Sequence, residues 1–218
     1  MKRQILTILL AFACLTAKAQ VSKAVKCTDN IFMLKGKVAS ELNVDRYLVY
    51  IWDYSQKEMP QPVDTLKVKN GRFEFSTTLD QPYSGMMKAV KKDGTTGEFF
   101  LEFFFVPGEE CKIDVKGEGL NEFTLSGSKF YRDWEAFAQF YDKTQKKAIA
   151  LNGAGDEEFF ASIAKYNRQH KDEEGCLMYQ CMWLSGSAMN FSMFDGIQDG
   201  RFKSYIQHRK NQYSSQGS

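Results

Sequence analysis

The sequence predicts an α+β fold, in which an antiparallel β-sandwich of about seven or eight strands precedes a small helical region. Two observations predict this fold. Short segments in which apolar and polar residues alternate recur from Ile31 to Ser126, as they do in antiparallel strands. After Ser128 the apolar period lengthens to about 3.6 residues, which is the period of an amphipathic helix.

The strands are predicted from short apolar segments between turn residues. Asn70-Gly71 joins two of these segments and suits a two-residue hairpin turn, because both residues tolerate positive φ. The segment 98–106 is apolar on both faces, so we expect both faces to be covered. Glu102 within it is expected to face water, because unpaired carboxylates are rarely buried. The predicted strands are residues 31–39, 46–54, 65–69, 72–76, 98–106, 111–116 and 123–125.

The helical region is predicted to begin at Ser128, which can cap the first helix. The apolar face of this helix holds Phe130, Trp134, Phe137 and Tyr141.

Asp156 is expected to cap a second helix, with Phe160, Ile163 and Ala164 facing inward. Two further helices are predicted, over residues 176–184 and 202–209.

The first residues have the pattern of a secretory signal peptide. Lys2 and Arg3 form a positive start, residues 5–15 are apolar apart from one threonine, and Ala17-Lys18-Ala19 is a small-x-small cleavage site. We therefore expect cleavage after Ala19 and a periplasmic mature protein. A lipoprotein anchored through Cys14 is a weaker alternative, because the residues before Cys14 match a lipobox poorly.

The predicted organisation has four parts. They are a signal peptide over residues 1–19, a β-sandwich domain over 20–127, a helical region over 128–212 and a disordered tail over 213–218. The leader carries three basic residues and no acidic one, so its removal changes the formal charge from +2 to −1. A near-neutral chain argues against nucleic-acid binding, which depends on phosphate neutralisation. We expect no transmembrane segment after cleavage, since none of the remaining apolar runs is long enough to span a bilayer.

Four segments of the β region resemble a domain of unknown function found in envelope proteins of the Bacteroidota. The matching segments are Leu34-Lys35-Gly36, residues 63–75, Phe104-Phe105-Val106-Pro107-Gly108 and Leu125-Ser126-Gly127-Ser128. The resemblance covers residues 31–135. It implies a domain that usually precedes a thioredoxin-like or peroxiredoxin-like domain, with the later helices resembling the linker between the two.

The chain departs from that architecture because it has no Cys-x-x-Cys motif. We therefore expect a non-catalytic accessory or docking module without a cofactor, whose partner is an envelope protein or a small ligand. One alternative is a thiol–disulfide oxidoreductase truncated before its catalytic domain. Another is a glycan- or lipid-binding envelope protein.

The cysteines of the mature chain are Cys27, Cys111, Cys176 and Cys181. Cys27 and Cys111 are candidates for a disulfide, on the ground that the periplasm is oxidising. Cys176 and Cys181 would lie about 7.5 Å apart along one intact helix, which is too far for a bridge. No metal site is predicted, because the two histidines are isolated and zinc needs three or four ligands.

Tyr50, Trp52 and Tyr54 form the candidate ligand-binding site, because alternate residues of a strand share one face. Exposed, this aromatic stripe could stack on a sugar or hold a peptide. The alternative, that these large side chains fill a core or lie beneath the helices, stays open.

Overall fold

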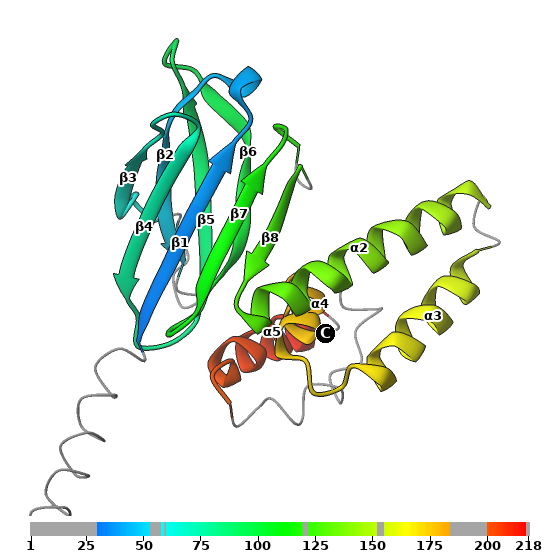
Figure 1. Ribbon diagram of the computed structural model, residues 1–218. Helices are drawn as coiled ribbons and strands as arrows, with labels where there is room; N and C mark the ends of the chain where they lie inside the picture. The colour runs from blue at the N-terminus through cyan, green and yellow to red at the C-terminus, as the bar shows by residue number, and fades with distance from the viewer. Residues whose placement is uncertain are drawn as a thin grey trace, which may run out of the picture.

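The computed structural model describes residues 30–52, 58, 60–119, 122–151, 155–183 and 200–216, with side chains described to residue 211. The predicted α+β class is confirmed: two four-stranded sheets are followed by four helices (Figure 1). The predicted signal peptide lies outside the described residues. No helix in the described part of the chain has both the length and the apolar character needed to cross a membrane.

The two sheets face each other across the main core. The first sheet has the strand order β4-β1-β7-β8, with β1 Ile31–Val38, β4 Arg72–Thr78, β7 Glu110–Val115 and β8 Phe123–Gly127. The second sheet has the order β3-β2-β5-β6, with β2 Val44–Trp52, β3 Asp64–Lys67, β5 Tyr83–Lys91 and β6 Thr96–Phe105. The strand pairs are antiparallel except β1 with β7, which is parallel and departs from the predicted all-antiparallel arrangement.

The predicted hairpin at Asn70-Gly71 forms, but it joins the two sheets instead of lying within one. Asn70 and Gly71 have φ of 52° and 68°, as a tight turn of this kind requires. Lys69 and Arg72 exchange backbone hydrogen bonds of 2.8 and 3.0 Å across the turn. Since β3 belongs to the second sheet and β4 to the first, the turn closes one side of the sandwich.

Two glycines make room for aromatic rings in the core. A Cβ on Gly36 of β1 would lie 2.0 Å from the ring of Phe73, its neighbour on β4. A Cβ on Gly85 of β5 would lie 2.0 Å from the ring of Phe105. The glycine in the Leu34-Lys35-Gly36 segment therefore has a packing role, because the Phe73 ring lies across its backbone.

Strand β5 was not among the strands predicted from the sequence. It pairs with β2 on one side and β6 on the other, so it is an interior strand of the second sheet. Its sequence, Tyr-Ser-Gly-Met-Met-Lys-Ala-Val-Lys, lacks the apolar alternation that marks most strands, and Val90 is its one β-branched residue.

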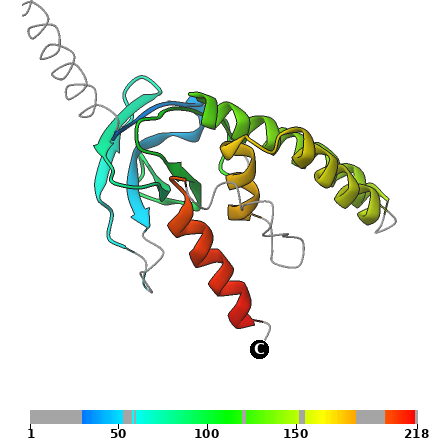
Figure 2. The same ribbon diagram turned by 90° about the horizontal axis from the view of Figure 1, so that it is seen from below.

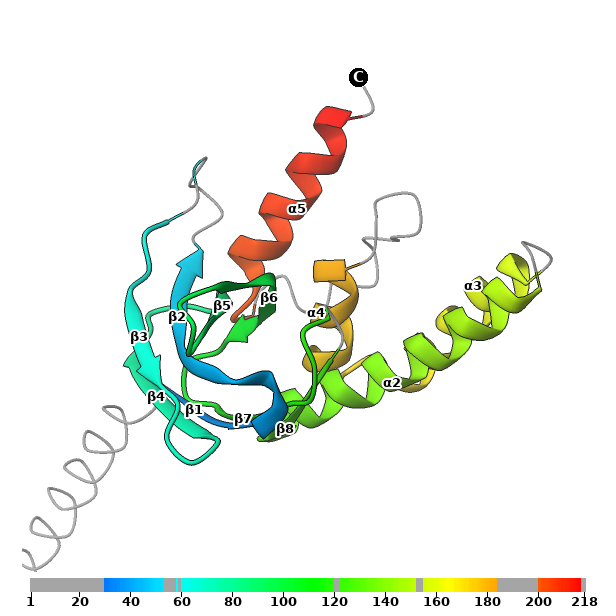
Figure 3. The same ribbon diagram turned by 90° about the horizontal axis from the view of Figure 1, so that it is seen from above.

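The helices are α2 Lys129–Ala150, α3 Asp156–Gln169, α4 Glu174–Trp183 and α5 Lys203–Gln216. Helices α2 and α3 run antiparallel and extend away from the sandwich, while α5 lies on the side of the second sheet (Figures 1 and 3). Helix α4 lies between α2 and α5 (Figure 2).

Helices α2, α4 and α5 share one core with the sandwich. The core is continuous from the strands through Phe130 and Tyr131 of α2, Leu177 of α4 and Ile206 of α5. The hydroxyl of buried Tyr131 donates a 2.8 Å hydrogen bond to the carbonyl of Phe104 in β6. The helical region therefore packs onto the sandwich and does not form a separate body.

Arg201, just before α5, ties three parts of the molecule together. Its guanidinium forms 2.8 Å ion pairs with Glu109, in the turn after β6, and with Glu174, at the start of α4. It also donates to the carbonyl of Pro107 at 3.4 Å. These contacts fix the beginning of α5 against the end of the sandwich.

The structure corrects three details of the predicted helices. Ser128 is in the N-cap position of α2, but its side chain makes no capping hydrogen bond and its Oγ is buried without a partner among the described residues. In α3 it is Phe159 that packs inward with Ile163, whereas Phe160 is 50% exposed and Ala164 is exposed. Helix α5 continues to Gln216, into the segment 213–218 that was predicted to be disordered.

Both faces of β6 were predicted to be covered, and this holds for its C-terminal half. Phe103 and Phe105 point into the sandwich, and Phe104 points outward beneath Phe202 and Tyr205 at T-shaped ring contacts of 5.3 and 4.7 Å. The prediction is wrong for the N-terminal half of the strand. In that half Phe99 is 38% exposed and Phe100 is half-buried.

Candidate binding groove

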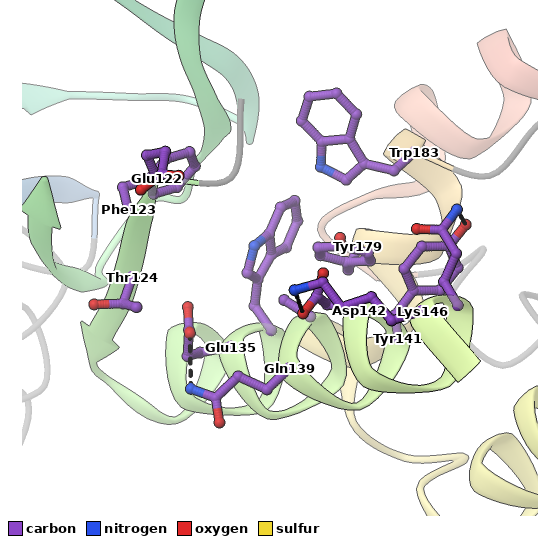
Figure 4. A pocket seen from close by; sticks show the side chains of 13 residues that line it. Glu122, Phe123, Thr124, Glu135, Gln139, Tyr141, Asp142, Lys146, Tyr179 and Trp183 are labelled. Atoms are coloured by element: carbon purple, nitrogen blue, oxygen red, sulfur yellow. Dashed lines mark hydrogen bonds and ion pairs between the residues drawn. The ribbon is translucent and has the colours of Figure 1, made fainter. Parts of the chain in front are cut away.

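A groove of about 290 Å³ lies between the edge strand β8 and helices α2 and α4 (Figure 4). Strand β8 forms one wall, α2 forms the floor and α4 forms the opposite wall. The lining residues are Glu122, Phe123, Thr124, Trp134, Glu135, Ala138, Gln139, Tyr141, Asp142, Gln145, Lys146, Tyr179 and Trp183.

Aromatic side chains at helical spacing form the inner part of the groove. Trp134 and Tyr141 are seven residues apart on α2, and Tyr179 and Trp183 are four apart on α4, so each pair shares one face of its helix. Trp134 and Tyr179 meet at 5.2 Å in a T-shaped contact, and Tyr141 lies 6.0 Å from Tyr179. These contacts hold the ring of Tyr179 in place between the two helices.

Trp183 is the most accessible of the aromatic residues in the groove. It is 39% exposed at the end of α4, whereas Trp134 is 2% exposed. Within the described residues its indole contacts no other aromatic ring. Trp183 thus offers the groove a ring face that is not used in packing (Figure 4).

Acidic side chains outnumber basic ones in the groove. Glu122 is exposed on the β8 wall, and Glu135 and Asp142 project from α2. Lys146 forms a 2.7 Å ion pair with Asp142 one turn away. Three carboxylates against one ammonium leave the lining with a formal charge of −2.

Glu135 connects the helix to the strand. Its Oε2 accepts a 2.8 Å hydrogen bond from the backbone N–H of Leu125, and its Oε1 accepts one of 2.9 Å from the amide of Gln139. Glu135 is therefore held in one orientation at the foot of the groove (Figure 4).

The groove raises the pKa of a tyrosine in its inner part. The pKa of Tyr179 is raised to about 12, mainly by burial. Tyr141, Asp142 and Glu135 raise it further. The Tyr179 hydroxyl therefore stays protonated at neutral pH. The described lining contains neither cysteine nor histidine, and two of its three carboxylates already have partners. This arrangement suits binding better than nucleophilic or acid–base chemistry.

The predicted aromatic stripe lies elsewhere, on the outer face of the second sheet. Tyr50 and Trp52 are both half-buried there, and Tyr54 lies outside the described residues. Tyr50 makes a 5.6 Å T-shaped contact with Phe100, and the Nζ of Lys88 lies 4.6 Å from the centre of the Phe100 ring. Tyr50 and Trp52 are thus neither buried in the core nor fully exposed to solvent. Neither residue lines the groove.

Glu102 lies on the same outer face. The sequence predicted that it faces open water, and this prediction is wrong. Glu102 is half-buried and accepts a 3.0 Å hydrogen bond from the hydroxyl of Ser84. Burial raises the pKa of its carboxyl, and the Ser84 hydrogen bond and the charge of Arg209 oppose the rise. Arg209 also donates to the carbonyl of Cys181 at 3.0 Å, so it joins α5 to the end of α4.

The described cysteines are buried thiols. Burial raises the pKa of Cys111 well above its usual range, and raises those of Cys176 and Cys181 to about 12. Cys111 forms no disulfide with a described residue. Cys27 lies outside the described residues, so the Cys27–Cys111 disulfide stays a prediction.

The described residues contain no group of three or more histidine, cysteine or acidic side chains placed to hold a metal ion. His170 instead stacks on Tyr166 at 4.0 Å and lies 3.1 Å from the carboxylate of Glu173.

The sequence did not reveal the groove. Its α4 wall is distant in the chain from β8 and α2, and the aromatic residues of α2 were interpreted as core. The residues that could have signalled it are Tyr179 and Trp183, whose spacing of four places two amphipathic aromatics on one face of α4.

The fold and the groove define a class of protein: a two-sheet β-sandwich with a helical extension that completes a groove lined by aromatic side chains. The family model "Domain of unknown function (DUF4369)" matches residues 24–134, just over half of the 218-residue chain, and the chain belongs to this family. The match covers the sandwich and the beginning of α2, in agreement with the range 31–135 predicted from the resemblance. No curated protein and no solved structure matches the chain.

Proposed function

We propose that this protein is a non-catalytic module of the bacterial cell envelope, exported to the periplasm, that acts by binding a ligand in the groove between β8, α2 and α4. The observation that carries the proposal is the composition of the groove, in which exposed and half-buried aromatic rings alternate with carboxylate and amide side chains. Ligand sites commonly combine apolar rings with a few polar groups that fix orientation.

The groove joins the family domain to its helical extension. Its β8 wall and Trp134 lie within residues 24–134, whereas Tyr179 and Trp183 lie beyond that range. The extension therefore adds nine of the thirteen residues that line the groove. This arrangement supports an accessory role, in which a common sandwich is adapted to its ligand by the helices that follow it.

The envelope setting rests on the leader and on the resemblance to domains that precede thioredoxin-like domains in the Bacteroidota. An accessory role beside envelope thiol–disulfide or peroxide chemistry fits that setting. The buried thiols Cys111, Cys176 and Cys181 favour a partner role over catalysis by this chain, since raised thiol pKa values suppress the reactive thiolate.

A second candidate function is glycan or lipid binding by Tyr50 and Trp52. Both side chains are half-buried on the outer face of the second sheet, beside Phe100 and Lys88. Part of each ring thus remains open to a ligand on that face.

The proposal is tested by photo-crosslinking in living cells. A diazirine amino acid replaces exposed Gln139 in the groove, and the matched control places it at exposed Lys165 on α3. We expect crosslinked adducts at position 139 and none at position 165. Mass spectrometry detects adducts of small molecules as well as of proteins. Equal labelling at the two positions, or turnover of a disulfide or peroxide substrate by purified residues 20–218, would contradict the proposal.

A further inference from the structure

We propose that the ligand of the groove is a small organic cation, a quaternary or protonated amine, held between aromatic faces and carboxylates. This inference rests on the proposed function of the groove as a binding site and names the chemical class that the site accepts.

The first argument is the set of aromatic rings. Five aromatic side chains from three elements line the groove, namely Phe123, Trp134, Tyr141, Tyr179 and Trp183. The face of an aromatic ring is electron-rich, and it attracts a cation within about 6 Å of its centre, most strongly when the ring is tryptophan. Trp183, which is 39% exposed, is available for such a contact.

The second argument is the charge of the lining. Its formal charge of −2 repels anions and favours cations. The Glu122 carboxylate is exposed and forms no ion pair in the described part of the chain, so it can pair with a ligand. Asp142 is shared with Lys146, whose side chain is 73% exposed and can move aside into solvent.

The raised pKa of Tyr179 agrees with this electrostatic picture. After burial, the contributions that keep its hydroxyl protonated come from Tyr141 and from the carboxylates of Asp142 and Glu135. A site that disfavours a phenolate favours a positive charge in the same place.

The third argument is size. A groove of about 290 Å³ lies at the lower end of the range for ligand pockets, about 300 Å³ and upward. It suits a head group of a few heavy atoms better than a long chain. An amine with small substituents fits both the volume and the charge.

The inference is tested by calorimetric titration of the mature chain, residues 20–218, with choline and with 3,3-dimethylbutan-1-ol, which has the same shape and no charge. We expect choline to bind at least about tenfold more tightly, because the cation–π and charge contributions are absent from the neutral analogue. Choline binding should also weaken as the salt concentration rises.

Variants locate the site. Trp183→Leu and Glu122→Gln change exposed side chains and should each weaken choline binding about tenfold, whereas Phe160→Leu, at an exposed aromatic residue of α3 outside the groove, should leave it unchanged. Circular dichroism checks that each variant is folded.

Three results would overturn the inference: equal binding of choline and its neutral analogue, choline binding that survives both groove variants, or binding of a neutral sugar such as maltose in place of choline. The last result would leave the groove as a binding site and the proposed function intact. If no crosslinking occurs at position 139 and choline does not bind, both the inference and the proposed function are contradicted.

Discussion

The backbone N–H of Leu125 donates a 2.8 Å hydrogen bond to the Glu135 carboxylate, so helix α2 covers the open edge of strand β8. Leu125 lies on the edge strand of the first sheet, and this N–H points away from β7. Arg132, one turn earlier on α2, donates in the same way to the carbonyl of Gly127. Exposed sheet edges invite pairing with other chains, and these two side chains occupy that edge.

Replacing Glu135 tests this protection. Glu135→Ala removes the acceptor of the Leu125 N–H and should lower the free energy of unfolding by about 1.5 kcal/mol, since hydrogen bonds to charged groups contribute about that much. Urea denaturation measures the loss, and size-exclusion chromatography reports self-association through the freed edge. Glu135→Gln keeps an acceptor oxygen and should lose less. Identical stability of the two variants would show that the hydrogen bond does not hold the edge.

The close packing of α4 on α2 depends on Gly175. A Cβ at this position would lie 2.0 Å from the carbonyl oxygen of Phe130 and 2.9 Å from the backbone nitrogen of Trp134. Gly175→Ala must therefore push the two helices apart, at a cost of about 1–3 kcal/mol. The control is Gly97→Ala, whose Cβ would meet Ala89 at an ordinary 3.4 Å. Thermal unfolding should separate the two variants, and an unchanged melting temperature for Gly175→Ala would refute the packing described.

The carboxyl of Glu102 should make stability depend on pH. Burial raises the pKa of this carboxyl above its ordinary value of 4.5 in the folded chain, so the folded state binds the proton more tightly than the unfolded state. Stability from this group is therefore present at low pH and is lost as pH rises through the folded pKa.

Glu102→Gln should accordingly stabilise the protein at about pH 7.5 and have little effect at about pH 4, as measured by urea denaturation. Glutamine keeps an acceptor for the Ser84 hydroxyl. The matched control is Glu98→Gln, an exposed residue of the same strand. A variant that is less stable than the wild type at about pH 7.5 would mean that the attraction of Arg209 outweighs burial.

The buried thiols should be unreactive in the folded protein. Burial raises the pKa values of Cys111, Cys176 and Cys181, so a thiol reagent at neutral pH should modify them only after unfolding. Labelling followed by peptide mapping measures this for each residue. The same map of the unreduced protein shows whether Cys27 and Cys111 form a disulfide. Rapid labelling of Cys181 in the native state would contradict the burial described.

The sequence predicted the fold class because apolar and polar residues alternate in most of its strands and turn dipeptides lie between them. It missed β5 because residues 84–87 of this strand are buried on both faces, so apolar and polar residues do not alternate there. Gly85, Met86 and Met87 then leave neither a period nor β-branched residues to detect. The Asn70-Gly71 turn was predicted correctly, but its role as a corner between sheets depends on pairing with β1 and β2, which are distant in sequence.

It was harder to predict which residues of a helix face inward where the apolar face of that helix is narrow. Helix α3 packs mainly against α2 through Phe159, Ile163 and Tyr166, and Phe160 is left outside. The groove could not be predicted for a related reason. Its lining combines Trp183 of α4 with β8, and no local pattern in the sequence encodes the packing that brings these two elements to one groove.

The chain contains three tryptophans, and their indole N–H resonances test the central claim most directly. Trp183 lies in the groove, Trp52 lies on the predicted stripe and Trp134 is buried beside Tyr179. When choline is added to ¹⁵N-labelled protein of residues 20–218, we predict that the Trp183 signal moves in a saturable way while the Trp52 signal stays still. A shift of Trp52 with Trp183 unmoved would place ligand binding on the second sheet and contradict the account.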